Sequence, residues 1–378
     1  MEKAGLYIHI PFCERKCHYC DFTSVPGNND LMDRYVERLI KEISMASDTY
    51  EDINIGTIFI GGGTPSILHE NKIADIMDAV RRDFSLDTHA EVTIEINPGT
   101  LTVDKAISYR ASGINRASVG IQSMNNGILK TIGRIHSEEQ VLTTVENLRR
   151  AGFENINGDI MFGLPHQSIE DFLQTLDKVI SLELEHISMY GLILEENTPL
   201  YRWYNRGLVC MPDEDEERVM YHTAIDSLEF GGYRQYEISN FAKEGFECRH
   251  NLGYWKLRPY IGVGLSSHSS ISGRRYWNSS NFSDYFNKLD RGILPIAGDE
   301  TISRDLMEAE YMILGIRLNE GISIEDYEKR FNTSFMGKYG EVINNHTKSG
   351  LIQLDDGTIR LTRKGMDLSN QVEIDFLP

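Results

Sequence analysis

Three cysteines lie in one short segment near the start of the chain, after a predicted strand: Cys13, Cys17 and Cys20. The C-x3-C-x2-C spacing lets three thiolates converge on one metal centre. A closed structural zinc site needs four protein ligands, and the two other cysteines, Cys210 and Cys248, stand singly and far away. In a [4Fe-4S] cube each thiolate binds one iron, which leaves the fourth iron for an exchangeable ligand. The spacing therefore favours a [4Fe-4S] cluster, and the alternative is a zinc loop completed by His9 or His18.

With the aromatic Tyr19 directly before the last cysteine, this segment resembles the cluster loop of the radical S-adenosylmethionine (SAM) enzymes. The resemblance implies that the amino and carboxylate groups of SAM chelate the open iron. It also implies that an electron from the cluster cleaves the sulfonium to a 5'-deoxyadenosyl radical, with flavodoxin or ferredoxin as the type of reductant.

The composition is that of a globular protein with a large core, since 40% of its 378 residues are hydrophobic. The formal net charge of -19 disfavours nucleic-acid binding, which depends on Lys and Arg neutralising phosphates. No signal-peptide pattern and no run of eighteen apolar residues is visible, so we expect a cytoplasmic protein without a membrane span. That compartment also keeps iron-binding cysteines reduced.

Strands and helices alternate over the first 190 residues, which predicts a parallel sheet with helices outside. The predicted strands are Leu6–His9, Ile53–Ile60, Glu91–Ile96, Arg116–Ile121, Asn155–Met161 and His186–Leu192. The predicted helices between them are Asn29–Met45, Asn71–Asp83, Thr102–Ser112, Glu138–Ala151 and Ser168–Leu182. Six units are fewer than the eight of a complete barrel. The family resemblance implies an incomplete (β/α)6 barrel.

The chain then loses this regularity, which predicts three parts: a barrel over residues 1–195, an extension over 196–300 and a C-terminal domain over 301–378. The last part is predicted as three helices, a hairpin that turns at Asp356-Gly357 and a final helix from about Arg363. This order resembles a smaller α+β winged-helix domain. Because the chain is acidic, we expect an interaction or lid role there rather than DNA binding.

Several polar residues follow predicted strands, at the end where ligands bind in parallel α/β folds. The three glycines of Gly61–Gly63 also follow a strand, and their missing Cβ atoms let the backbone approach a ligand closely. The chain resembles anaerobic coproporphyrinogen III oxidase over nearly its whole length. This resemblance places SAM contacts at Tyr7, Gly62, Gly63, Thr64, Glu95, Gln122, Arg134, Asp159 and Ile193.

Two features depart from the oxidase. The oxidase carries an extension before its cluster loop and a further cysteine after it, where this chain has Asp21. Asp21-Phe22 and His250-Asn-Leu-Gly-Tyr-Trp255 are instead similar to the related heme chaperones of the HemW type, whose H-N-x-x-Y-W segment is associated with heme. A neutral imidazole can ligate heme iron, and Tyr254 and Trp255 offer apolar faces to a macrocycle. The alternative is that His250 caps a turn while the two aromatic residues pack over the barrel.

The resemblance therefore implies a heme chaperone that binds heme, a [4Fe-4S] cluster and SAM. Its partner would be a client hemoprotein, such as a membrane-associated respiratory enzyme. The alternative is oxygen-independent coproporphyrinogen III oxidation, in which a radical removes hydrogen from propionates that then lose carbon dioxide. Whether SAM is turned over, and so whether the protein is an enzyme, stays open at this point.

Overall fold

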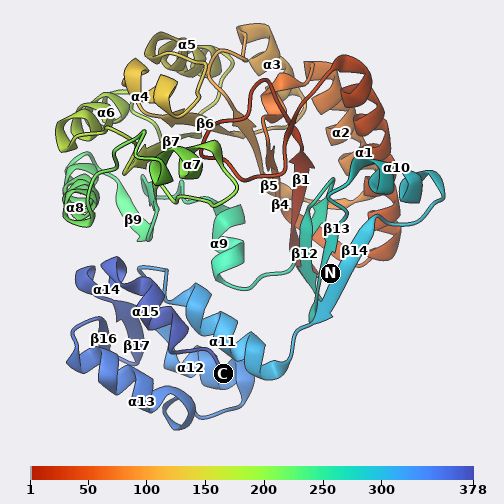
Figure 1. Cartoon of the computed structure of the whole chain (residues 1–378). Coiled ribbons are helices and arrows are strands. Elements are labelled where there is room, and N and C mark those ends of the chain that lie inside the picture. Colours follow the sequence, from red (N-terminus) through yellow and green to blue (C-terminus); the bar gives the residue numbers. More distant parts are fainter. Residues whose placement is uncertain (1) are drawn as a thin grey trace.

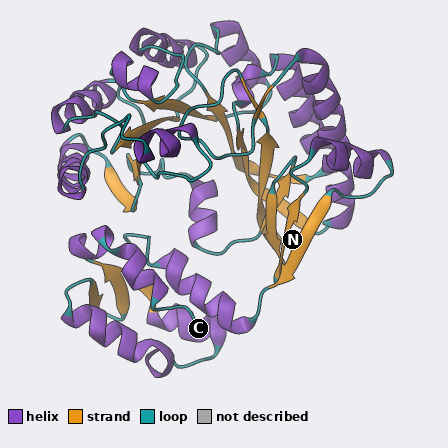
Figure 2. Ribbon diagram, in the orientation of Figure 1, coloured by secondary structure: helices purple, strands orange, loops and turns teal. Residues whose placement is uncertain are grey.

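The computed structural model describes residues 2–378, in which one mixed sheet of twelve strands forms the main body (Figures 1 and 2). The sheet order is β14-β13-β12-β11-β1-β4-β5-β6-β7-β8-β10-β9. Its parallel run is β1 (Glu2–Ile10), β4 (Ile53–Gly62), β5 (Ser85–Ile96), β6 (Arg116–Gln122), β7 (Ile156–Phe162) and β8 (His186–Gly191). Because the curved sheet does not close on itself, it is an incomplete (β/α)6 barrel, as predicted.

Helices cover the convex face of this sheet, and loops gather on the concave face (Figure 1). The outer helices are α1 (Asn29–Thr49), α2 (Glu70–Asp83), α3 (Val103–Ala111), α4 (Asn126–Thr131), α5 (Glu138–Arg150), α6 (Ile169–Ser181) and α8 (Glu214–Phe230). Side-chain caps determine where several of these helices begin. At the start of α1, for example, the Asn28 side chain accepts a hydrogen bond from Leu31 N.

Strand β1 shows that the two faces of the sheet carry different kinds of side chain. Leu6, Ile8 and Ile10 are fully buried in the core beneath the outer helices. The alternate residues Tyr7 and His9 face the concave side, because successive side chains of a strand point to opposite faces. The apolar residues of β1 thus pack against the helices, and the polar residues that alternate with them line the concave face, where a binding site can form.

The segment between the barrel and the C-terminal domain is more regular than the sequence indicated. It contains α7 (Pro199–Asn205), β9 (Arg234–Glu237), β10 (Asn240–Ala242), α9 (Arg249–Trp255), β11 (Tyr260–Val263), β12 (His268–Ile271), β13 (Arg274–Asn278), α10 (Phe282–Asp290) and β14 (Ile296–Thr301). Strand β11 pairs in parallel with β1, and β12–β14 continue the same sheet antiparallel. These strands extend the sheet beyond β1, which sequence periodicity did not predict.

The C-terminal part has its own hydrophobic core, which runs from Met312 to Phe376. It contains α11 (Arg304–Gly315), β15 (Ile322–Ser323), α12 (Ile324–Phe331), α13 (Phe335–Lys348), β16 (Ile352–Asp355), β17 (Thr358–Leu361), α14 (Arg363–Asp367) and α15 (Ser369–Ile374). Its small sheet has the order β15-β17-β16. Helix α11 packs against α9, so this part lies across the open side of the barrel (Figure 1).

Helix α1 is fastened to the sheet extension by the buried carboxylate of Glu42. It accepts from the Tyr285 hydroxyl, from Gly264 N at 2.9 Å and from the Asn278 amide. Burial raises the pKa of Glu42 to about 7, although these three donors favour the charged form.

Glu42→Gln is expected to make stability less dependent on pH. A carboxyl group whose pKa is raised by folding stabilises the protein fully below its unfolded value, and this contribution is lost as pH rises through about 7. The free energy of unfolding of the wild type should therefore fall, relative to the variant, by about 1 kcal/mol between pH 6 and pH 8. Urea unfolding at both pH values measures this, and a constant difference would contradict the assignment.

Candidate cofactor site

The segment that carries the three cysteines, residues 13–24, is here called the cluster loop. Its two ends are joined by strands β2 (Phe12–Cys13) and β3 (Val25–Pro26), which pair in parallel. Its middle is held by His18, whose backbone N–H donates to Ile132 O and whose carbonyl accepts from Leu200 N, both at 2.9 Å. Two distant parts of the chain therefore fix the position of the loop at the carboxyl end of β1.

Of the two histidines of the zinc alternative, His9 has both ring nitrogens hydrogen-bonded and His18 has one. In His9, Nδ1 is hydrogen-bonded to the Tyr7 hydroxyl at 2.9 Å and Nε2 to Thr23 O at 3.0 Å. His18 Nδ1 is hydrogen-bonded to Thr131 O at 3.0 Å. Within residues 2–378, no three His, Cys, Asp or Glu side chains meet closely enough to hold a single metal ion. A [4Fe-4S] cube does not require the three thiolates to meet at one metal ion, because each thiolate binds a separate iron.

The glycine run brings the end of β4 against the cluster loop. Gly63 N donates to Ile10 O at 2.8 Å, and Thr64 N donates to Phe12 O at 2.7 Å. A Cβ atom at Gly63 would lie 2.5 Å from Phe12 O, so only glycine fits. The Thr64 hydroxyl then donates to Cys13 Sγ at 3.6 Å and accepts from the Asn97 amide at 2.8 Å. The glycines thus place polar donors beside a thiol.

A group of charged side chains lies on the concave face next to the cluster loop. Glu95 accepts from Gly62 N at 3.0 Å, and its pKa is raised to about 7 by burial and by the nearby Asp159 carboxylate. The Arg134 guanidinium donates to Asn97 Oδ1 at 2.9 Å and to Gly120 O at 3.3 Å. Its third nitrogen, Nε, is buried and has no partner among residues 2–378. This unpaired donor is available to a ligand.

The remaining residues of the predicted cofactor site are Tyr19 of the cluster loop and further predicted SAM contacts, and their surroundings differ. Gln122 is buried at the end of β6, with a φ of 63°, and Tyr19 packs on a small apolar cluster beside the cluster loop. Tyr7 lies on the concave face, where its ring stacks on Phe59 at 6.4 Å. Ile193, in contrast, lies two residues beyond β8, and 71% of it is exposed. Its contact with SAM stays a prediction.

The His250-Asn-Leu-Gly-Tyr-Trp255 segment lies in α9, on the concave side, and is helical. Glu91 of β5 holds the start of α9, because its carboxylate accepts from Arg249 N at 3.0 Å and from His250 N at 2.9 Å. Trp255 lies under the Arg317 guanidinium of the C-terminal part, 4.7 Å from the ring centre. Helix α9 thus connects the barrel to that part.

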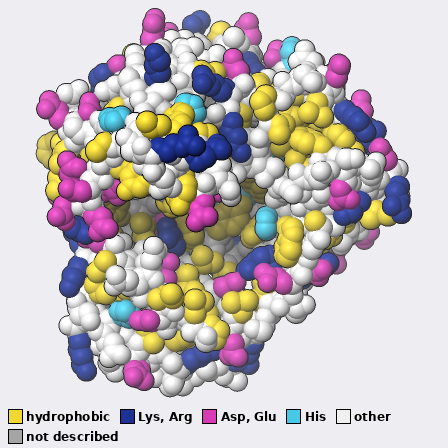
Figure 3. Space-filling view, in the orientation of Figure 1, with side chains coloured by type: hydrophobic (Ala, Val, Ile, Leu, Met, Phe, Trp, Pro, Cys, Tyr) yellow, Lys and Arg dark blue, Asp and Glu magenta, His cyan; other side chains and the backbone are white. Residues whose placement is uncertain are grey.

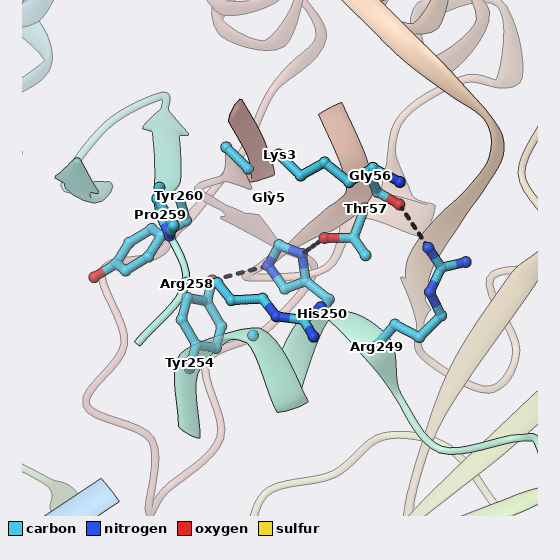
Figure 4. Close-up of a pocket in the computed structure, with 12 residues that line it drawn as sticks. Lys3, Gly5, Gly56, Thr57, Arg249, His250, Tyr254, Arg258, Pro259 and Tyr260 are labelled. Atoms are coloured by element: carbon cyan, nitrogen blue, oxygen red, sulfur yellow. Dashed lines mark hydrogen bonds between the residues drawn. The ribbon is translucent and has the colours of Figure 1, made fainter. Parts of the chain in front are cut away.

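His250 is only 4% exposed, and both its ring nitrogens are hydrogen-bonded. Nδ1 pairs with the Thr57 hydroxyl and Nε2 with the Tyr254 hydroxyl, each at 2.9 Å (Figure 4). Burial lowers the pKa of His250 to about 3, so the imidazole is neutral at physiological pH. A neutral ring can ligate iron, but Nε2 becomes free only when Tyr254 moves. Heme ligation by His250 stays a prediction.

Comparison with known proteins decides the family. The radical SAM superfamily model matches residues 7–179, and the HemN C-terminal domain model matches residues 303–368. The heme chaperone HemW of Lactococcus lactis is 38% identical over 374 residues, covering 98% of this chain and 96% of its own. This chain belongs to the HemW family of radical SAM proteins. The HemW of Bacillus subtilis is 35% identical, with 98% of each chain covered.

The HemW family fold is also seen in a solved structure. Coproporphyrinogen III oxidase (HemN) from Escherichia coli superposes with a TM-score of 0.87 and covers 99% of this chain and 90% of its own, at 23% identity. This likeness confirms the predicted fold class. Within residues 2–378, no helix is both long enough and apolar enough to cross a membrane.

Membership of the radical SAM superfamily implies a [4Fe-4S] cluster and SAM, and the residues present fit both. Cys13, Cys17 and Cys20 would hold the cluster, which supplies one-electron chemistry when bound. Arg134 supplies an unpaired buried N–H, and Gly63 lets the end of β4 lie directly against the backbone of Phe12, next to the first cysteine. Glu95 and Tyr7 lie on the same concave face, where Glu95 accepts a hydrogen bond from Gly62 N.

Sequence reasoning missed the residues that connect this HemW-family site to α9. The ring of Phe59 packs on Tyr7 on one side and on His250, at 5.3 Å, on the other. Arg116 is fully buried on the concave face, and its Nε has no partner within the described chain. These residues could have been found from the polar residues that alternate with apolar ones in the predicted strands, such as Glu91, Thr57 and Arg116. Such alternation places their side chains on one face of the sheet.

Proposed function

We propose that this protein is a heme chaperone, which binds heme together with a [4Fe-4S] cluster and SAM and delivers heme to client hemoproteins. The observation that carries the proposal is near-complete coverage, at 35–38% identity, of two bacterial proteins named heme chaperone HemW. Helix α9 supports it, because it holds a neutral imidazole, covered by Tyr254, together with two aromatic residues on the concave side of the barrel. In this proposal the cluster and SAM regulate or drive heme release and do not remake a porphyrin.

Two assays on one anaerobically reconstituted sample test the proposal. Hemin titration should give a saturable shift of the Soret band, and heme should pass from the loaded protein to apomyoglobin, used here as an acceptor probe. Coproporphyrinogen III incubated with SAM and reductant should remain unchanged. Formation of vinyl product would instead assign the protein to the oxidase reaction, and absence of any heme binding would reject the chaperone role.

A further inference from the structure

A small pocket beside His250 is unusual in this acidic chain because cations line it and carboxylates do not. It lies between α9 and the amino ends of β1 and β4, and its volume is about 60 Å³ (Figure 4). Lys3, Arg249 and Arg258 contribute positive charge to the lining, and no Asp or Glu does so. Elsewhere Asp and Glu outnumber Lys and Arg, at 57 to 38 over the whole sequence. The face of the molecule in Figure 3 likewise shows both signs interspersed.

The cations of the pocket are incompletely neutralised. Arg249 donates to two backbone carbonyls, His89 O at 2.8 Å and Gly56 O at 3.4 Å, which carry no net charge. Arg258 forms no ion pair within residues 2–378, whereas Lys3 pairs with Asp87 at 2.6 Å. Arg258 is therefore unpaired, and Arg249 is bonded only to neutral carbonyls, so both guanidinium groups keep a positive charge that an anion can neutralise. Guanidinium is the side chain best suited to carboxylates.

The size of the pocket limits what can enter it. Pockets that enclose drug-sized ligands are roughly 300–1,000 Å³, so a macrocycle does not fit while Tyr254 is in place. Tyr254 lines the pocket and covers His250 Nε2. Movement of the Tyr254 ring would open the pocket and expose Nε2 together, which lets a flat ligand approach the imidazole with its edge toward the cations.

We propose that Arg258 and Arg249, assisted by Lys3, bind the propionate carboxylates of heme at the mouth of this pocket. The proposal rests on the proposed function and adds to it the groups that recognise and orient the ligand. Heme carries its two carboxylates at one edge, so cations on one side of His250 fix one orientation of the macrocycle. Charge-assisted pairs with arginine also discriminate heme from neutral porphyrins.

The test compares hemin with its dimethyl ester, whose carboxylates are blocked, in anaerobically reconstituted full-length protein. We expect the wild type to bind hemin at least tenfold more tightly than the ester. Arg258→Gln should weaken hemin binding about tenfold and leave ester binding unchanged, and Lys3→Gln should have a smaller effect. Arg291→Gln is the matched control, because it removes an exposed cation beyond α10. Thermal unfolding verifies that each variant is folded.

The outcomes separate this inference from the proposed function. Equal affinity for hemin and ester, or an Arg258→Gln variant that binds hemin as the wild type does, would overturn the propionate site and leave the chaperone role intact. A wild type that binds neither ligand would reject the chaperone role itself. Displacement of hemin by a few millimolar inorganic phosphate would assign the cations to free anions and also overturn the propionate site.

Discussion

Cys17→Ala is expected to abolish the iron–sulfur cluster. Two remaining thiolates hold a cube poorly, and His9 cannot replace the third, since both its ring nitrogens are already hydrogen-bonded. Reconstituted variant protein should therefore lack the brown absorbance and contain less than about a tenth of the iron and sulfide of the wild type. Cleavage of SAM by the protein, measured in the presence of a chemical reductant, should be lost as well.

Cys210→Ala is the matched control for this experiment. Cys210 is exposed and lies outside the cluster loop, so its loss should leave the iron content unchanged. An unaltered cluster in Cys17→Ala, or zinc in place of iron and sulfide in the wild type, would contradict the assignment. Heme binding by Cys17→Ala should survive, because α9 is built by different residues.

His250→Ala is expected to weaken heme binding tenfold or more, which corresponds to about 1.4 kcal/mol or more. The substitution removes the neutral imidazole that Phe59, Thr57 and Tyr254 hold at the pocket. A Soret titration measures the affinity, and the position of the Soret band reports the change of axial ligand. His250→Gln retains a polar side chain in the same place and guards against collapse of α9.

Two further variants make the test specific. Tyr254→Phe breaks the hydrogen bond to His250 Nε2, worth about 1 kcal/mol, and should raise heme affinity about fivefold. His268→Ala is the matched control: this histidine stacks on Trp277 in the sheet extension, outside α9, and its loss should have no effect. If His268→Ala loses the Soret shift while His250→Ala keeps it, the ligand assignment is wrong.

The sequence by itself determined the features that depend on neighbours along the chain. Cys13, Cys17 and Cys20 could be grouped because all lie on one short loop. The parallel strands and outer helices were predicted because hydrophobic periodicity is local to each element. The element boundaries were less certain: β5 begins at Ser85, six residues before the predicted start, since pairing with β4 decides where a strand begins.

The tertiary structure alone decided how α9 meets the barrel. Glu91 lies about 160 residues before His250 in the sequence, yet its carboxylate holds the start of α9. Thr57 of β4 and Tyr254 together occupy both nitrogens of the imidazole, so a residue that the sequence offered as a ligand is covered in this conformation. The sequence predicted an extension of the barrel over residues 196–300 but not its strands β11–β14. These strands are short, and hydrophobic periodicity does not specify how they pair. Contacts of this kind are fixed by packing between distant segments, and only the folded chain brings them together.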